Sequence, residues 1–540
     1  MFNFKDIIQY NPARKNSLWL LFPLGMVIVA GSFIIPSHYF LKEIVAFGVM
    51  SLAVFLVCDF FLKTRSYKTF LYLGYLFLAF FAFVKLSFYH QYNVPISSSA
   101  LYVIFETNSG EASDYLSNYF NWGTYLLAFL FLIPLIFMLK GLFRKNKFQG
   151  TLTKRSFLEK SLLLLAALGC VFIIQKKFRT QNIPYATVAT WDDYILAKEQ
   201  LKDALAIPTS NAFKGVTSKS TPQTYVVVIG ESTSRWHMQL YGYHRKTNPR
   251  LAEIQHELVI MDSVITPHVH TITALEKILT LADTETTKPS PNGSTIQLAN
   301  MAGFKTYWLS NQKPVGLYES IPTIIGSAAQ NTRFLATDDY NHQIYDGDVL
   351  PVLNEILKNT TDSKKIIFVH LIGTHVSYEK RYPKAFEKFT TPSEILKFQH
   401  TKAIEQTNAY DNAILYNDYI LREIIEILKK EKGYSYMAYF SDHGDEVYDT
   451  MELVGHNEYH GTRPMFEVPL LFWFSEKYKN LHGFFPKNVT DRTYSLTDFP
   501  YTFASLSHIQ FKGYDASRNV LDSTFVARKR IVKDSIDYDN

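Results

Sequence analysis

The stretch YMAYFSDHGDE, residues 436–446, joins an apolar run to a polar turn. The apolar run predicts a buried strand, and Asp442 and His443 follow its end. A carboxylate and an imidazole are ligand types that suit zinc, and Gly444 lets the backbone turn sharply. The same residues also suit an ordinary polar turn after a strand, so this stretch alone does not decide between a metal site and a turn.

A second stretch, YVVVIGES at residues 225–232, repeats the pattern far upstream. Its β-branched run predicts a strand that ends in a glycine and is followed by Glu231. Ligands of open α/β sheets collect at the carboxyl ends of the strands. Glu231, Asp442 and His443 would then surround one metal ion. The alternative is that Glu231 is an acid at the start of a helix, where the helix dipole favours negative charge.

Strand-like and helical patterns alternate through the chain after about residue 224. Strands are predicted at residues 225–229, 257–265, 305–310, 366–371, 435–441 and 468–474. Helices are predicted at 346–358 and 402–431, the second with apolar residues close to helical spacing. This alternation predicts an α/β domain with a mainly parallel sheet covered by helices on both faces.

The first part of the chain, up to about residue 180, is rich in Leu, Phe, Ala and Val. Segments of this composition are long enough to cross a bilayer. The expected spans are roughly residues 17–36, 41–62, 69–89, 122–141 and 159–176. The last of these is the shortest, so a buried core helix is its alternative, but lysines flank it on both sides. The first span is too late, and followed by too many others, to be a cleaved signal peptide.

The net charge is +6, and the positions of the Lys and Arg residues in the first part of the chain indicate its orientation in a membrane. Lys and Arg precede the first span and fill the loops between spans two and three and between spans four and five. The loop 90–121 contains neither residue. Because basic loops stay in the cytoplasm, five crossings place everything after residue 180 outside, in the periplasm of a Gram-negative cell. Both cysteines, Cys58 and Cys170, lie in apolar segments, so no disulfide is expected in the polar part.

Three regions follow from these patterns. Residues 1–178 are expected to form a five-span membrane domain. Residues 179–224 are expected to be a connector at the membrane surface, because 208–223 has the Ser, Thr, Lys and Pro content of a linker. Residues 225–540 are expected to form the periplasmic catalytic domain.

Further polar residues follow strand ends. Thr271 lies in PHVHTITA, residues 267–274; His375 ends GTH; and His456 and His460 lie in GHNEYHG, residues 455–461. Each is equally an ordinary hydrogen-bonding loop residue. Together they outline a metal centre, a hydroxyl nucleophile and flanking histidines, because a metal-bound hydroxyl loses its proton more readily than one in water.

The motifs in this order resemble those of the alkaline phosphatase/sulfatase superfamily. More narrowly, they resemble the bacterial membrane phosphoethanolamine transferases that modify lipopolysaccharide. The resemblance covers nearly the whole chain and rests on residues 227–232, 235 with 241–243, 267–274, 381–383, 441–445, and 460–461 with 468–469. It implies an inner-membrane protein with five N-terminal spans, a sulfatase-type periplasmic domain, and a threonine nucleophile beside zinc.

The resemblance also implies roles for individual residues. Glu231, Asp442 and His443 would be zinc ligands. Thr271 would be the fourth ligand and the nucleophile, with Thr273 as the alternative.

Four further residues take substrate roles by the same resemblance. His375 and His460 would contact the phosphoryl group or a second metal and assist proton transfer. Asn408 and Asp411 would contact the ethanolamine ammonium.

The implied reaction moves phosphoethanolamine from phosphatidylethanolamine to lipopolysaccharide through a covalent phosphoethanolamine–threonine intermediate. The added ammonium would weaken the binding of cationic peptides such as polymyxin. No nucleic-acid partner is expected.

Two departures bear on the acceptor. The polar part has no cysteine, whereas lipid A-modifying members usually carry several disulfides there. The histidines before Thr271 look more like members that modify the heptose core, so heptose core and lipid A both remain open. The alternatives are a lipoteichoic-acid-synthase-like glycerol-phosphate transferase, a hydrolysing sulfatase or phosphodiesterase, and a non-catalytic membrane sensor on the same fold.

Overall fold

The computed structural model divides the chain into two compact units, residues 1–194 and 195–540. It describes residues 16–62, 66–97, 120–143, 156–219, 221–282, 292–312, 321–336, 345–359, 362–482 and 488–540, with a few isolated residues between 100 and 116. The division falls within α11, Ile183–Leu205.

The first unit is built from apolar helices. They are α3 (Leu21–Val29), α4 (Gly31–Ile34), α5 (Ser37–Phe60), α6 (Tyr67–Tyr92), α9 (Trp122–Phe143) and α10 (Phe157–Lys177). Among the described residues, Ser17–Ile34, α5, α6 and α10 are each long and apolar enough to cross a membrane. Helices of membrane length are therefore present at four of the expected spans. The fifth expected span, 122–141, lies on α9, whose apolar stretch Trp122–Met138 is shorter and contains Pro134.

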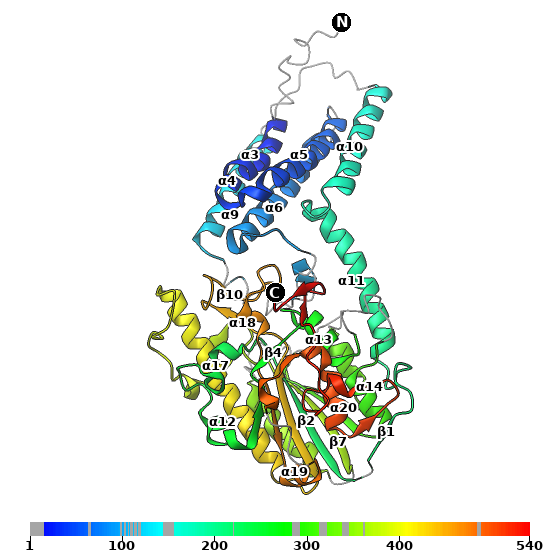
Figure 1. The fold of residues 1–540 in the computed structure, drawn as a ribbon. Coiled ribbons are helices and arrows are strands. Elements are labelled where there is room, and N and C mark those ends of the chain that lie inside the picture. The colour runs from blue at the N-terminus through cyan, green and yellow to red at the C-terminus, as the bar shows by residue number, and fades with distance from the viewer. Residues whose placement is uncertain are drawn as a thin grey trace. The chain divides into compact units, whose positions relative to one another are not determined.

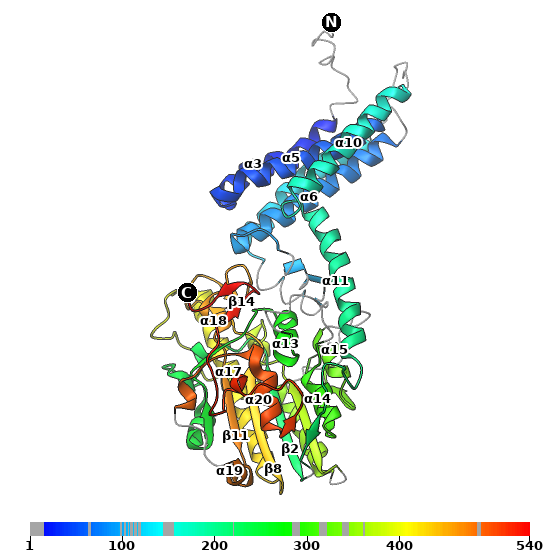
Figure 2. The ribbon, with the colours of Figure 1, turned by 45° about the vertical axis from the view of Figure 1, so that its right-hand side comes forward.

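The second unit is organised by a seven-stranded sheet with the order β3-β11-β8-β2-β7-β5-β6 (Figures 1 and 2). The strands are β2 (Gln223–Gly230), β3 (Leu258–Ile260), β5 (Lys305–Ser310), β6 (Asn331–Phe334), β7 (Lys364–His370), β8 (Tyr434–Ser441) and β11 (Leu470–Phe474). Only β11 runs antiparallel to its neighbours β8 and β3. The mainly parallel sheet is therefore confirmed.

Helices cover both faces of this sheet. Side chains of the central strand β2 therefore alternate between two buried layers. Tyr225, Val227 and Ile229 pack into one core, and Val226 and Val228 pack into the other. The first layer contains α13 (Thr271–Leu279), α14 (Thr295–Met301), α15 (Ile321–Ser327) and α20 (Phe499–Leu506). The second contains α12 (Pro249–Glu253), α16 (Val349–Lys358) and α17 (Thr401–Leu428).

Two strands differ from the sequence prediction. The expected strand 257–265 divides into β3 and β4 (Ser263–Ile265), and β4 pairs in parallel with β12 (Thr493–Ser495) outside the main sheet. The edge strand β6 was missed because its sequence, Asn-Thr-Arg-Phe, lacks a buried apolar pattern.

The remaining elements are short. They are α18 (Arg463–Phe466), α19 (Glu476–His482), and the two-stranded pairs β1 (Thr217–Ser218) with β13 (Ile509–Gln510), β9 (Glu446–Val447) with β10 (Val454–Gly455), and β14 (Ile531–Val532) with β15 (Ile536–Asp537).

Candidate active site

The strand pairing at the centre of the sheet creates the site. Gly230 of β2 pairs with Ser441 of β8, so the next residues, Glu231 and Asp442, leave adjacent strand ends. The backbone N–H of Asp442 donates to the Gly230 carbonyl at 3.2 Å, which holds the two ends together. The predicted meeting of the two motifs is thus a direct consequence of parallel pairing.

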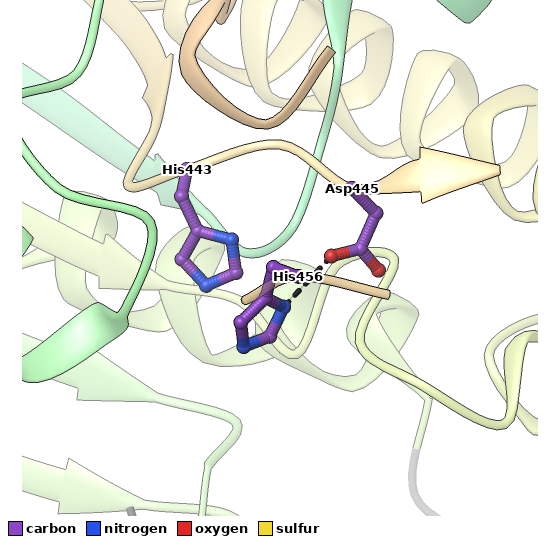
Figure 3. Close-up of side chains that lie close together, drawn as sticks. All are labelled: His443, Asp445 and His456. Carbon is purple, nitrogen blue, oxygen red and sulfur yellow. Dashed lines mark hydrogen bonds and ion pairs between the residues drawn. The ribbon is translucent and has the colours of Figure 1, made fainter. Parts of the chain in front are cut away.

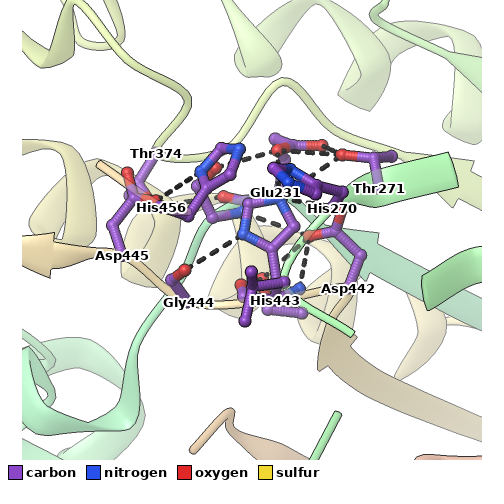
Figure 4. Close-up of polar contacts among 12 residues, drawn as sticks. Glu231, His270, Thr271, Thr374, Asp442, His443, Gly444, Asp445 and His456 are labelled. Atoms are coloured by element: carbon purple, nitrogen blue, oxygen red, sulfur yellow. Dashed lines mark hydrogen bonds and ion pairs between the residues drawn. The ribbon is translucent and has the colours of Figure 1, made fainter. Parts of the chain in front are cut away.

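Four side chains converge at this edge (Figure 4). His443 Nε2 lies 3.2 Å from Glu231 Oε1 and 3.6 Å from Asp442 Oδ2. The ligand atoms of Glu231, Asp442 and His443 all lie within 4.8 Å of one another. Thr271, the first residue of α13, places Oγ1 at 3.1 Å from Glu231 Oε2 and 3.4 Å from His443 Nε2.

Hydrogen bonds orient the ligand atoms. His443 Nδ1 lies 3.0 Å from the Gly444 carbonyl oxygen, a contact that turns Nε2 toward Glu231, Asp442 and Thr271. Glu231 Oε1 accepts from the Ser232 hydroxyl at 2.8 Å, and Oε2 accepts from Gln312 Nε2 at 3.2 Å.

Asp442 leaves one oxygen for a further partner. Its Oδ1 accepts from the backbone N–H groups of Ser232 and His443 at 3.2 and 2.7 Å. Its Oδ2 is buried and has no hydrogen-bond partner among the described residues. Such an atom requires a compensating group, and a bound cation would supply it.

The electrostatics favour a bound cation. Burial raises the pKa of Asp442, and the adjacent Glu231 carboxylate raises it further. Burial alone would also raise the pKa of Glu231, but His443 holds it well below its ordinary value. Two carboxylates buried side by side repel each other unless a positive charge lies between them. One imidazole nitrogen with carboxylate and hydroxyl oxygens is a donor set that fits zinc.

Comparison with known proteins assigns the family. Residues 223–509 match the sulfatase family profile. Phosphoethanolamine transferase EptC of Escherichia coli K12 is 32% identical over 489 residues, covering 84% of this chain and 83% of EptC. The chain belongs to the phosphoethanolamine transferases of the sulfatase family. The family suggested by the sequence motifs is confirmed.

Two solved structures confirm the architecture of this transferase. The periplasmic domain of Escherichia coli EptC, crystallised with zinc, is 33% identical and has a TM-score of 0.58, covering 62% of this chain and 97% of that one. The integral membrane transferase EptA from Neisseria meningitidis shares the fold with a TM-score of 0.62 at 20% identity, covering 94% of this chain and 97% of that one. A helical membrane part followed by a sulfatase-type domain is therefore the fold class.

A second group of titratable side chains, half-buried His456 and buried Asp445, adjoins His443 (Figure 3). His456 Nδ1 lies 2.8 Å from Asp445 Oδ1, and the His456 ring centroid lies 4.1 Å from that of His443. Tyr378 donates its hydroxyl proton to Asp445 Oδ2 at 2.7 Å. Burial, reinforced by the charge of His443, holds the pKa of His456 well below its ordinary value. The sequence pattern placed His456 only among the flanking histidines, since loop spacing alone does not bring it against His443.

The two histidines expected at the phosphoryl group occupy different surroundings. His375 follows Thr374, whose backbone N–H and hydroxyl both donate to the Glu231 carbonyl, at 2.9 and 3.1 Å. His375 Nδ1 is buried and lacks a hydrogen-bond partner within the described part of the chain. His460 is half-buried between β10 and α18, four residues after His456.

The two candidate nucleophiles differ in orientation. Thr271 Oγ1 contacts Glu231 and His443, whereas Thr273 Oγ1 donates to the backbone carbonyl of His270 at 3.2 Å. The geometry therefore supports Thr271 over Thr273.

The residues expected at the ammonium, Asn408 and Asp411, lie on α17 in a buried ionic network. Arg245 Nη1 donates to Asn408 Oδ1 at 2.8 Å and to Asp411 Oδ2 at 2.7 Å. Asp411 Oδ1 lies 2.7 Å from His237 Nδ1. Burial would lower the pKa of His237, but Asp449 and Asp411 raise it to about 10, so the network holds a histidine cation at neutral pH.

The fold leaves no room for a side chain at Gly444. A Cβ atom at this position would lie 2.2 Å from the Pro464 carbonyl oxygen, which is backbone and has little room to move. Gly444→Ala is therefore expected to destabilise the protein by about 1–3 kcal/mol and to lower its zinc occupancy. Thermal unfolding and metal analysis of the detergent-purified protein measure both effects. Gly169→Ala is the control, because a Cβ there meets no atom within 4 Å; an equal loss in both variants would contradict the steric argument.

Proposed function

We propose that this enzyme transfers phosphoethanolamine from phosphatidylethanolamine to lipopolysaccharide through a covalent intermediate on Thr271. The observation that carries the proposal is the position of Thr271 Oγ1, 3.1 Å from Glu231 Oε2 and 3.4 Å from His443 Nε2. The helices would lie in the inner membrane and the catalytic domain in the periplasm.

We propose that Glu231, Asp442, His443 and Thr271 hold zinc. The oriented Nε2 of His443 and the unpartnered Oδ2 of Asp442 support this ligand set, as does the zinc complex of the Escherichia coli relative. When bound, zinc would lower the pKa of the Thr271 hydroxyl and offset negative charge on the phosphoryl oxygens.

In the first step, Thr271 Oγ1 forms a bond to phosphorus while the bond to the diacylglycerol oxygen breaks. Thr271 is the first residue of α13, so the positive end of a nine-residue helix faces the phosphoryl group and favours its negative charge. His375 and His460 are proposed to contact the phosphoryl oxygens, to take the proton that the Thr271 hydroxyl loses, and to give a proton to the departing diacylglycerol oxygen.

In the second step, a hydroxyl or phosphate oxygen of the acceptor attacks the phosphorus, and Thr271 leaves. An acceptor hydroxyl must lose a proton. His456 is placed for this task, because its ring lies against that of His443 and its Nδ1 contacts Asp445 Oδ1. His375 and His460 are the other proposed acceptors of the proton. The products are the phosphoethanolamine-bearing glycolipid and free Thr271.

Asn408 and Asp411 are proposed to bind the ethanolamine ammonium. Their contacts with Arg245 give them a competing structural role, and Asn408→Ala separates the two. Headgroup binding predicts a KM for phosphatidylethanolamine raised roughly tenfold with little change in kcat. A structural role predicts a lower thermal midpoint with KM unchanged. A fluorescent donor assay and thermal unfolding of the same preparation give both quantities.

The function is tested with the donor and the acceptor in turn. Purified enzyme should release diacylglycerol from phosphatidylethanolamine and not from phosphatidylglycerol. Release from phosphatidylglycerol alone would establish a glycerol-phosphate transferase, and release from neither would favour a sensor. Mass spectra of lipopolysaccharide from cells with and without the gene should differ by one phosphoethanolamine, and fragmentation assigns it to heptose core or lipid A.

A further inference from the structure

The last residues of the chain form a hairpin whose turn touches the proposed nucleophile segment. Strands β14 and β15 are joined by Lys533, Asp534 and Ser535, of which the first two have φ values of +52° and +60°. The Ser535 N–H donates to the Val532 carbonyl at 3.3 Å, closing the turn. Positive φ at the central residues of such a turn is normally taken by Asn, Asp or Gly. Asp534 suits this conformation, whereas a lysine at position 533 strains the backbone.

The carboxylate of Asp534 contacts residues on both sides of Thr271. Asp534 Oδ1 lies 2.7 Å from Lys277 Nζ on α13 and 3.4 Å from His268 Nε2 before that helix. The Lys533 N–H also donates to the Pro267 carbonyl at 3.0 Å. The hairpin turn thus contacts the segment just before Thr271, at Pro267 and His268. It also contacts the last turn of α13, at Lys277.

The same network reaches the segment that carries His456. Glu458 Oε1 lies 2.8 Å from His268 Nδ1, and Glu458 Oε2 accepts from the Val269 N–H at 3.0 Å. Burial would lower the pKa of His268, but Asp534 and Glu458 raise it to about 9. A cationic His268 is therefore held between two carboxylates from different parts of the chain. Lys533 Nζ also donates to the Tyr459 carbonyl at 3.4 Å.

We propose that Asp534 is a positioning residue for the transfer reaction. Its carboxylate holds His268 and Lys277 so that Thr271 and His456 keep their places around the metal. The inference rests on the proposed function, because it assumes that Thr271 is the nucleophile. The C-terminal hairpin, β14 with β15, thereby takes part in positioning the nucleophile, a role that the strand-end motifs do not predict.

Asp534→Gly tests the proposal without disturbing the turn, since glycine is favoured at positive φ. The thermal midpoint should stay within about 4 °C of wild type or rise, because the Asp534 side chain is 52% exposed and its ion pairs add little stability. The kcat for diacylglycerol release should fall roughly 10- to 100-fold, since small misplacements of a nucleophile cost this much. KM should change by less than about threefold, because the headgroup contacts are untouched.

Controls separate positioning from general stability. Asp537→Asn removes an ion pair with Lys529 in the same hairpin and should leave kcat unchanged. Asp534→Glu should restore part of the rate. His268→Gln should lower kcat as Asp534→Gly does, and the double variant should lose less than the product of the two single losses, since the residues belong to one network.

The outcomes also separate this proposal from the function itself. If wild type releases diacylglycerol and Asp534→Gly retains the full kcat, the positioning role is wrong while the transferase function stands. A fully additive double variant would also overturn it. If wild type releases no diacylglycerol from phosphatidylethanolamine, the function fails first.

Discussion

Thr271→Ala is expected to abolish diacylglycerol release, lowering kcat by roughly 10³-fold or more, as removal of a covalent nucleophile does. The hydroxyl is placed against Glu231 and His443. Wild-type protein quenched with phosphatidylethanolamine should carry a phosphoethanolamine adduct on the peptide 267–274. The adduct should be absent from the variant.

Thr273→Ala is the matched control for the nucleophile. Thr273 Oγ1 donates a hydrogen bond to the His270 carbonyl at 3.2 Å. Removing this one hydrogen bond at the end of the helix should leave kcat within a few-fold of wild type. An adduct on Thr273, or a normal rate in Thr271→Ala, would show that the nucleophile has been assigned to the wrong residue.

Asp442→Asn is expected to remove both zinc and activity. The substitution keeps the size of the side chain but takes away the charge that balances the cation, and it leaves a neutral amide where the unpartnered Oδ2 now lies. Metal content should fall from about one zinc per chain to a small fraction, and transfer should fall in proportion. Because zinc binds the folded state only, a chelator should lower the thermal midpoint of wild type and leave that of the variant unchanged.

Asp418→Asn controls for the loss of a buried carboxylate as such. Asp418 accepts from the backbone N–H groups of Arg250 and Leu251, both at 2.9 Å, at the start of α12. Its replacement should lower stability and leave zinc content and the chelator effect intact. Full zinc occupancy in Asp442→Asn would remove Asp442 from the ligand set.

The sequence by itself determined much of this protein. The apolar segments predicted helices of membrane length, and four were found. A β-branched run ending in glycine predicted β2, and an apolar run ending in serine predicted β8. The carboxylates that follow them indicated Glu231, Asp442 and His443 as candidate ligands. These features are local, because hydrophobic periodicity and strand-end chemistry are written in consecutive residues.

Other features depended on contacts between distant segments, so only the tertiary structure decided them. The pairing of Gly230 with Ser441 brought Glu231 and Asp442 together, and contacts with Glu231 and His443 distinguished Thr271 from Thr273. His456 meets His443 through the path of the loop after β10. Asp534 joins residues more than 250 positions away in the chain, such as His268. Sequence patterns report which residues are buried and where strands end, but side chains that meet across the fold are brought together by packing and hydrogen bonds that no local pattern encodes.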